Sequence, residues 1–159
     1  MKIQRTKGGG VVWQLSELER RGLEKIFEGY PMIPAGYHRL SKRTATPATH
    51  DGQEVLEEAL AEQKGEGKKM LERLWNRRLR PSSVVAGFVL ALKPAEVESL
   101  LQIVNELRVG NWIKLGSPGL NSDWRPPLSV DTAKHLHALQ VCGEVEMLLL
   151  AALAGGDGK

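Results

Sequence analysis

A short apolar run that leads into a helical pattern occurs twice along the chain. The first copy covers residues 11–27 and the second covers 88–104, and in both copies apolar residues return at helical spacing after the run. Both copies therefore predict a strand followed directly by a helix. Four identities share an offset of 77 residues: Leu15, Glu19, Leu23 and Ile26 recur as Leu92, Glu96, Leu100 and Ile103. The repetition predicts two βα units that superpose and share one core.

The N-terminal pattern predicts a β-hairpin followed by a capped helix. Residues 2–6 and 11–15 flank the glycines 8–10, which can adopt the positive φ of a tight turn. Ser16 and Glu19 have the spacing of a capping box. The apolar residues of this helix, which we expect to face the core, are Leu18, Leu23, Ile26 and Phe27.

A second helical pattern covers 53–80, between two irregular segments. We expect either one interrupted helix or two helices, because Gly65 and Gly67 each cost up to about 1 kcal/mol in a helix interior. Proline and glycine are frequent in the irregular segments, which cover about 30–52 and 116–129.

The second half of the chain predicts one strand and two helices. The strand covers 84–92, and the helix after it begins at Pro94, whose missing N–H suits a first turn, and can end at Gly110. The last helix runs from about Val130 to Leu153.

This last helix is apolar on nearly every side. One broad face carries Cys142, Val145 and Leu149, and a second carries Met147 and Leu150. A helix that is apolar all round belongs in a core or an interface. A domain of this size has little room to surround a helix completely, so we expect a neighbouring subunit to cover the second face.

Together these elements predict an α+β fold in one domain, residues 1–159. An N-terminal β-hairpin and one further strand form a small sheet, which packs with four to five helices. A chain of 159 residues is long enough to bury a single sizeable core. Aromatic residues make up only 5%, so the core is expected to be mainly aliphatic.

Composition favours a cytoplasmic protein. The single cysteine, Cys142, excludes an internal disulfide and a four-cysteine zinc site. No apolar segment follows the basic N-terminus, so no signal peptide is expected. The most apolar stretch, 141–154, contains Glu144 and Glu146 and is too short to span a bilayer, so no membrane partner is expected.

Charge is unevenly placed, although the formal net charge is only +3. Residues 1–15 contribute +3 and residues 68–80 contribute +5, so the remainder sums to −5. Four basic residues at helical spacing are candidate nucleic-acid contacts: Lys69, Arg73, Arg77 and Arg80. The alternative is a solvated helix with acidic residues early and basic residues late, as the helix dipole favours.

No residue set predicts catalysis, a cofactor or a metal. The glycines 8–10 lack the following helix and Lys-Ser/Thr pair of a phosphate loop. His135 and His137 point about 200° apart on a helix. Cys142 lies in an apolar helix, where a small buried thiol is the common case. The missing signatures favour a non-enzymatic protein and leave the enzyme question open.

Two places are candidate protein contacts. Trp124 and Arg125 lie together in an irregular segment, a combination typical of contact sites, although the tryptophan can equally fold back over the core. Met147 and Leu150 lie on the second face of the last helix.

Short motifs resemble an uncharacterised bacterial family, domain of unknown function 2017. They are Asn-Glu-Leu-Arg at 105–108, Val-Gly-Asn-Trp at 109–112, Leu-Gly at 115–116 and the Leu-Ser-x-x-Glu helix start at 15–19. The resemblance covers the first 27 residues and roughly 88–116. It implies a bacterial, cytoplasmic, non-enzymatic protein, and it brings no known activity and no catalytic residues.

The leading interpretation is a protein-interaction or regulatory module that self-associates, with a homodimer and an unidentified protein as partners. The alternative is a nucleic-acid-binding protein that uses the basic segment 68–80. Neither interpretation calls for a cofactor.

Overall fold

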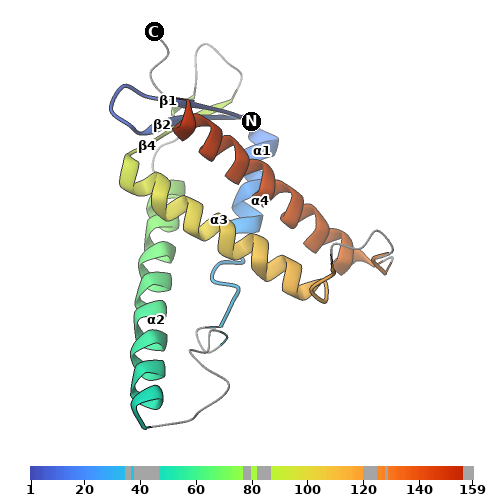
Figure 1. The fold of residues 1–159 in the computed structure, drawn as a ribbon. Helices are drawn as coiled ribbons and strands as arrows, with labels where there is room; N and C mark the ends of the chain where they lie inside the picture. Colours follow the sequence, from blue (N-terminus) through green and yellow to red (C-terminus); the bar gives the residue numbers. More distant parts are fainter. Residues whose placement is uncertain are drawn as a thin grey trace.

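In the part of the chain that the structure describes, one small antiparallel sheet packs with four helices (Figure 1). The computed structural model describes residues 1–34, 37, 47–76, 80–81, 87–119, 125–127 and 129–155. Within these ranges the strands are β1 (Lys2–Arg5), β2 (Val11–Leu15), β3 (Arg80–Pro81) and β4 (Phe88–Leu92). The helices are α1 (Glu17–Phe27), α2 (Pro47–Asn76), α3 (Pro94–Lys114) and α4 (Val130–Ala154). The predicted α+β class is confirmed.

The sheet has the order β1-β2-β4-β3, with every neighbouring pair antiparallel. The predicted hairpin is β1–β2, closed by a turn in which Gly9 has a φ of 77°. The predicted further strand is β4, and its described part begins at Phe88. The short strand β3 was not expected: Arg80 lies in this strand, so the prediction of a helix through Arg80 was wrong.

The two βα units pair symmetrically at the centre of the sheet. Trp13 of β2 lies opposite Leu90 of β4, which is its own equivalent at the 77-residue offset. Val11 lies opposite Leu92 and Leu15 opposite Phe88, so the register is unchanged when the two strands are exchanged. The pairing therefore has the geometry of a twofold axis that passes between Trp13 and Leu90.

The symmetry extends to both ends of each strand. Gly10 and Gly87 are equivalent, and a Cβ on either would run into a carbonyl oxygen of the other unit, that of Leu92 or Leu15 respectively. At the outgoing ends, Glu19 Oε2 accepts a hydrogen bond from the backbone N–H of Ser16 at 2.8 Å, and Glu96 Oε2 accepts one from Lys93 N at 2.8 Å. The prediction of two βα units is confirmed, and the order ββαα occurs twice along the chain.

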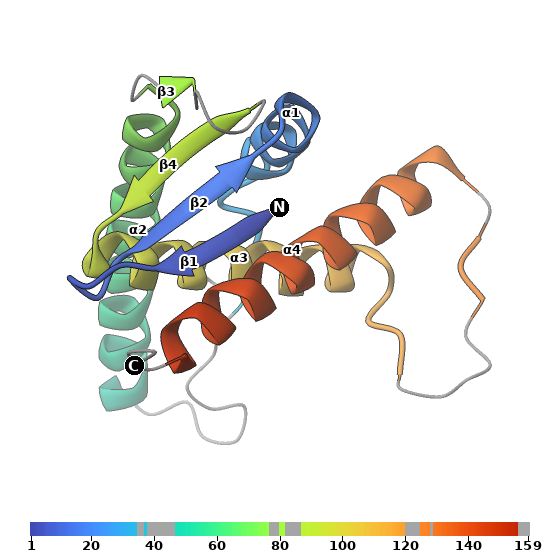
Figure 2. The ribbon, with the colours of Figure 1, turned by 90° about the horizontal axis from the view of Figure 1, so that it is seen from above.

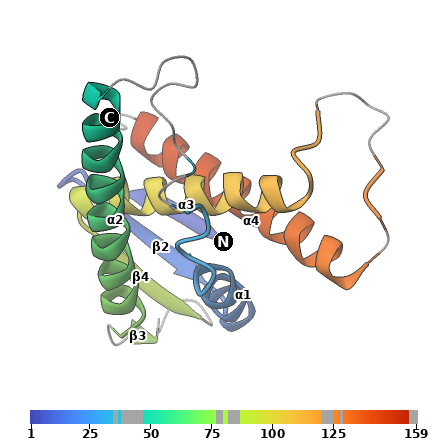
Figure 3. The ribbon, with the colours of Figure 1, turned by 90° about the horizontal axis from the view of Figure 1, so that it is seen from below.

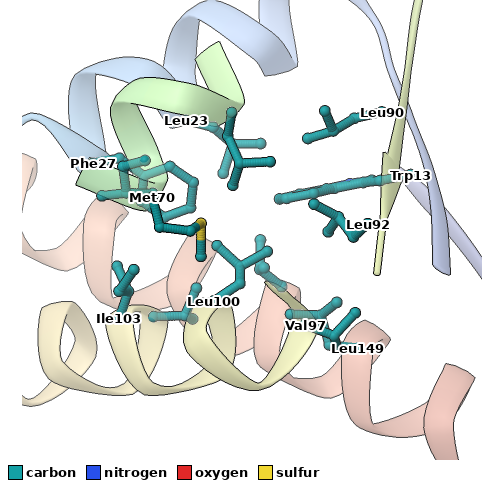
Figure 4. Close-up of a cluster of buried hydrophobic side chains, with 14 of the residues drawn as sticks. Trp13, Leu23, Phe27, Met70, Leu90, Leu92, Val97, Leu100, Ile103 and Leu149 are labelled. Atoms are coloured by element: carbon teal, nitrogen blue, oxygen red, sulfur yellow. The ribbon is translucent and has the colours of Figure 1, made fainter. Parts of the chain in front are cut away.

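The core lies between the sheet and the helices on one of its faces (Figure 4). Trp13 and Leu90 point from the sheet toward Leu100 of α3 and Leu23 of α1. Seen from below, α2 and α3 lie across the strands (Figure 3). Helix α4 passes across α3 with its C-terminal end beside β1, where Arg5 donates a hydrogen bond to the Leu153 carbonyl at 3.2 Å (Figure 2).

Helix α2 is one uninterrupted helix of 30 residues, which decides between the two predicted arrangements. It begins at Pro47, inside the segment predicted to be irregular, because proline is well suited to the first turn. Gly67 lets the Tyr30 ring pack directly on the helix, since an added Cβ would lie 2.7 Å from the Tyr30 hydroxyl oxygen. Space around Gly65 is open. The N-terminal half of α2 projects from the rest of the fold (Figure 1).

Helix α3 continues through Gly110 to Lys114, so the predicted end at Gly110 was wrong. The glycine is needed for packing, because the Met32 side chain occupies the space that a Cβ would fill. Gly116, with a φ of 85°, follows the actual end of the helix.

A largely buried ion pair joins α2, α3 and the chain that follows α1. Lys64 Nζ lies 3.4 Å from Glu106 Oε1 and donates a hydrogen bond to the Ile33 carbonyl. Glu106 Oε1 accepts hydrogen bonds from the backbone N–H groups of Met32 and Ile33, both at 3.1 Å. Burial, with Glu106 nearby, raises the pKa of Tyr30 to about 12. These contacts hold the C-terminal half of α2 against α3.

The two glycines of α2 provide a matched test of this packing. Gly65→Ala should increase the free energy of unfolding by about 0.5–1 kcal/mol, because alanine favours the helix and meets open space. Gly67→Ala should decrease it by about 1 kcal/mol, because the overpacking against Tyr30 outweighs the same gain in propensity. Urea unfolding followed by circular dichroism measures both changes.

Tyr30→Phe serves as the second control, since the nearest atom to the added Cβ is the Tyr30 hydroxyl oxygen. It should recover part of the loss in the Gly67→Ala background. Equal effects of alanine at positions 65 and 67 would contradict the packing described for Tyr30.

Candidate functional site

Only two of the four predicted nucleic-acid contacts lie on the described part of α2. Lys69 and Arg73 are exposed on the helix. Lys69 Nζ forms an ion pair with Glu66 at 2.9 Å, and Arg73 Nε donates to the Lys69 carbonyl at 3.2 Å. Arg77 lies outside the described residues, and the backbone of Arg80 belongs to β3. The prediction of four basic residues along one helix was therefore wrong at Arg80.

Of the predicted contact pair Trp124 and Arg125, the structure describes only Arg125. Trp124 lies outside the described residues, and Arg125 is exposed. The predicted contact formed by these two neighbours stays a prediction.

Helix α4 has one buried face and one exposed apolar face. Cys142, Val145 and Leu149 are buried against the core, as predicted. Met147 is 63% exposed and Leu150 is 50% exposed, so the prediction that α4 is buried on nearly every side is wrong for the isolated chain. These two candidate contact residues are therefore accessible to a partner.

By length and composition alone, α4 would be able to cross a membrane. Its 25 residues extend beyond the stretch 141–154 that was considered too short in the sequence, and the prediction of no membrane partner stays a prediction. The structure buries 22% of its most apolar window. Glu144 and Glu146 lie in its second half, and ionised carboxylates are costly in the bilayer core.

A groove runs between the exposed faces of α3 and α4. It encloses a hollow of about 540 Å³, and Trp112, 38% exposed, forms part of its wall. The Trp112 indole N–H donates to the Pro118 carbonyl at 3.1 Å, which fixes the ring. The residues that line the groove are Arg108, Val109, Trp112, Leu139, Gln140 and Gly143.

Polar contacts lock α3 to α4 on the inner side of this groove. The buried Asn111 donates through Nδ2 to the Leu107 carbonyl at 2.7 Å, and its Oδ1 lies 2.8 Å from His135 Nδ1. The amide oxygen is an acceptor, so Nδ1 of His135 is the protonated ring nitrogen. Arg108 Nε lies 2.9 Å from Glu146 Oε2. The contacts give His135 a structural role and keep both walls of the groove in fixed positions.

A second apolar hollow, of about 360 Å³, lies between α1 and α4. Leu18, Leu23 and Ile26 of α1 line it together with Val141 of α4. Leu18 is 82% exposed, so the prediction that Leu18 faces the core was wrong, whereas Leu23 is buried as predicted. Helix α4 is therefore a ridge with an apolar hollow on each side.

The Cys142 thiol lies on the buried side of α4. Burial raises the pKa of the Cys142 thiol to about 12, which suppresses the nucleophilic thiolate. Within the described part of the chain, no three His, Cys, Asp or Glu side chains come together as metal ligands. The α3–α4 groove thus offers apolar contact area with a tryptophan wall, which suits binding to another apolar surface.

The sequence pattern predicted the exposed residues of α4 but not the α3 side of the groove. Met147 and Leu150 follow from helical periodicity, whereas Val109 and Trp112 lie on another helix. Trp112, one turn after Arg108, is the sequence feature that indicates a contact surface on α3.

No family model, curated protein or solved structure matches the chain. The resemblance to domain of unknown function 2017 therefore stays a prediction.

The thiol provides a direct test of the buried face of α4. With a pKa of about 12, on the order of 1 in 10,000 Cys142 side chains is ionised at pH 8. We expect no reaction of the folded protein with Ellman's reagent over an hour, and one thiol per chain in guanidinium chloride. Rapid reaction of the folded protein would contradict the burial of Cys142 and would reopen the nucleophile.

Proposed function

We propose that the chain is a non-enzymatic, cytoplasmic protein-interaction module that self-associates through the exposed side of α4. The observation that carries the proposal is the exposure of Met147 and Leu150 on a helix whose opposite side is fully packed. Fully burying an exposed leucine contributes roughly 1.5–3 kcal/mol, so covering the half-exposed Leu150 together with Met147 contributes favourably to association.

Two features of the surrounding surface support a protein partner. The walls of the α3–α4 groove are held by the Asn111–His135 and Arg108–Glu146 contacts, so little ordering is needed on binding. The groove also carries Trp112, and tryptophan is enriched in the residues that dominate binding energy.

The alternative is nucleic-acid binding through Lys69 and Arg73. Both are exposed on α2, which favours the alternative, but Lys69 is already paired with Glu66, and the exposed Glu58 and Glu62 precede both basic residues along the helix. An acidic and a basic half on one exposed helix are typical of a solvated surface.

Self-association predicts that Leu150→Glu separates the copies. Light scattering after size-exclusion chromatography at micromolar concentration should give a multiple of 17.5 kDa for the wild type and 17.5 kDa for the variant. Because Leu150 is half-exposed in the isolated chain, we expect the free energy of unfolding of the monomer to change by no more than about 0.5 kcal/mol.

Leu18→Glu is the matched control, since it replaces an exposed leucine of α1 by the same residue. It should leave the assembly intact. A wild type that is monomeric at these concentrations would contradict self-association, and dissociation by Leu18→Glu alone would move the contact to the α1–α4 hollow.

The alternative is tested by reversing the described basic residues. We expect the wild type and the Lys69→Glu/Arg73→Glu variant to show equally weak retention of DNA and RNA in a salt series from 50 to 200 mM. Their melting temperatures should also agree, because exposed charges contribute little to stability. Steeply salt-dependent binding by the wild type that the variant lacks would favour the nucleic-acid function instead.

A further inference from the structure

The two ββαα units carry helices of opposite surface chemistry at the same place in the order. Helix α2, the last helix of the first unit, exposes Glu58, Glu62 and Arg73 to solvent. Helix α4, the last helix of the second unit, instead exposes Met147 and Leu150. A helix in contact with water carries mainly polar residues on its outer side, as α2 does apart from Val55, which is 67% exposed. The outer side of α4 therefore differs from that of α2 by an apolar patch at Met147 and Leu150, which lies beside the exposed Gln140 and Glu144.

Along the outer side of α4, apolar residues are spaced symmetrically before and after Gly143. Leu139 and Met147 lie four residues before and after it, and Leu136 and Leu150 lie seven residues before and after it. Separations of four and seven residues return to the same side of a helix. In a dimer with twofold symmetry the same surface patch of both copies forms the interface, so the patch must be complementary to itself. An antiparallel pair of α4 helices centred on Gly143 meets this condition.

The shape of the surface supplies the matching hollow. The α3–α4 hollow is lined by Leu139 and Gly143, and Met147 stands one turn further along the helix as an exposed knob. In an antiparallel pair centred on Gly143, Met147 of each copy lies over Leu139 of the other, at the hollow. Space beside Gly143 is open, since an added Cβ meets no atom within 4 Å. Methionine adapts well to an irregular cavity.

The area that a stable dimer needs is larger than the exposed side of α4 alone can supply. A helix of 25 residues is about 37 Å long, and a strip about 10 Å wide along it covers on the order of 400 Å². A stable interface buries about 800 Å² per partner. The exposed side of α4 supplies about half of this, so the pair must also use the α3 wall at Val109 and Trp112.

The charges at the rim suit a second copy better than a membrane. Arg108 and Glu146 already form an ion pair at the groove, and the exposed Glu144 follows Gly143 about 100° around the helix, where the rim of a protein interface leaves it in water. Insertion of α4 into lipid would instead require desolvation of Glu144 beside that pair.

We propose that two copies of the chain associate through antiparallel α4 helices that cross at Gly143, with Met147 of each copy in the α3–α4 hollow of the other. The proposal rests on the self-association proposed above and adds its geometry. A residue on the twofold axis meets its own counterpart. A residue four positions away lies about 6 Å from the axis along the helix, which separates the two copies of it by about 12 Å.

Cysteine cross-linking tests this geometry. In a Cys142→Ala background, Gly143→Cys should give a disulfide-linked dimer under mild oxidation with copper phenanthroline, because two Cα atoms at the crossing lie within disulfide range. Met147→Cys alone should give at least tenfold less, because about 12 Å exceeds that range. If Gly143→Cys disturbs folding, an equimolar mixture of the Leu139→Cys and Met147→Cys variants should cross-link between the two variants.

Light scattering on the same samples before oxidation separates the two proposals. A dimer that cross-links at Met147 alone, or at none of these positions, overturns the antiparallel geometry and leaves self-association in place. A monomer that never cross-links overturns both. If the protein is a monomer and co-sediments with phosphatidylcholine vesicles, the proposed dimer is wrong and a lipid surface covers α4 instead.

Discussion

The antiparallel pairing of β2 with β4 is the constraint on which the rest of the fold depends. Trp13 lies opposite Leu90, and both side chains are buried on the same face of the sheet. Each strand passes directly into a helix, so α1 and α3 leave from opposite ends of the pair and must cover that one face. Gly10 and Gly87 permit this arrangement, because each lets the backbone of the other unit approach closely. The order ββαα in each half then adds α2 and α4 around one core.

The parts of the fold that sequence predicted are those that depend on local spacing. The repeat, the capping box at Ser16 and the buried position of Cys142 all follow from periodicity or from residues within one turn. The predictions that failed depend on distant contacts. Gly110 lies within α3 and leaves the space that Met32 fills, a residue far away in the sequence. The burial of Lys64 beside Glu106 and the Ile33 carbonyl, which no pattern predicted, depends on distant contacts in the same way. Periodicity along one helix carries no information about such partners.

The same distinction applies to the candidate site. Met147 and Leu150 could be predicted because they lie at helical spacing on an apolar helix. The wall formed by Val109 and Trp112 could not, because it depends on how α3 and α4 cross. Leu18 fits an apolar face by spacing but lies at the outer edge of α1, where no element covers it. Such errors occur where the fold, and not the helix itself, decides which side faces water.

The central claim is that the exposed apolar side of α4 is covered in the working protein. Hydroxyl-radical footprinting of the wild type over a range of protein concentrations tests it most directly, with the oxidation of Met147 as the readout and that of Leu18 as the reference. Met147 is 63% exposed in the isolated chain, so the account predicts that its oxidation falls several-fold as concentration rises, while that of Leu18 stays constant. Oxidation of Met147 that stays high at every concentration would contradict the account.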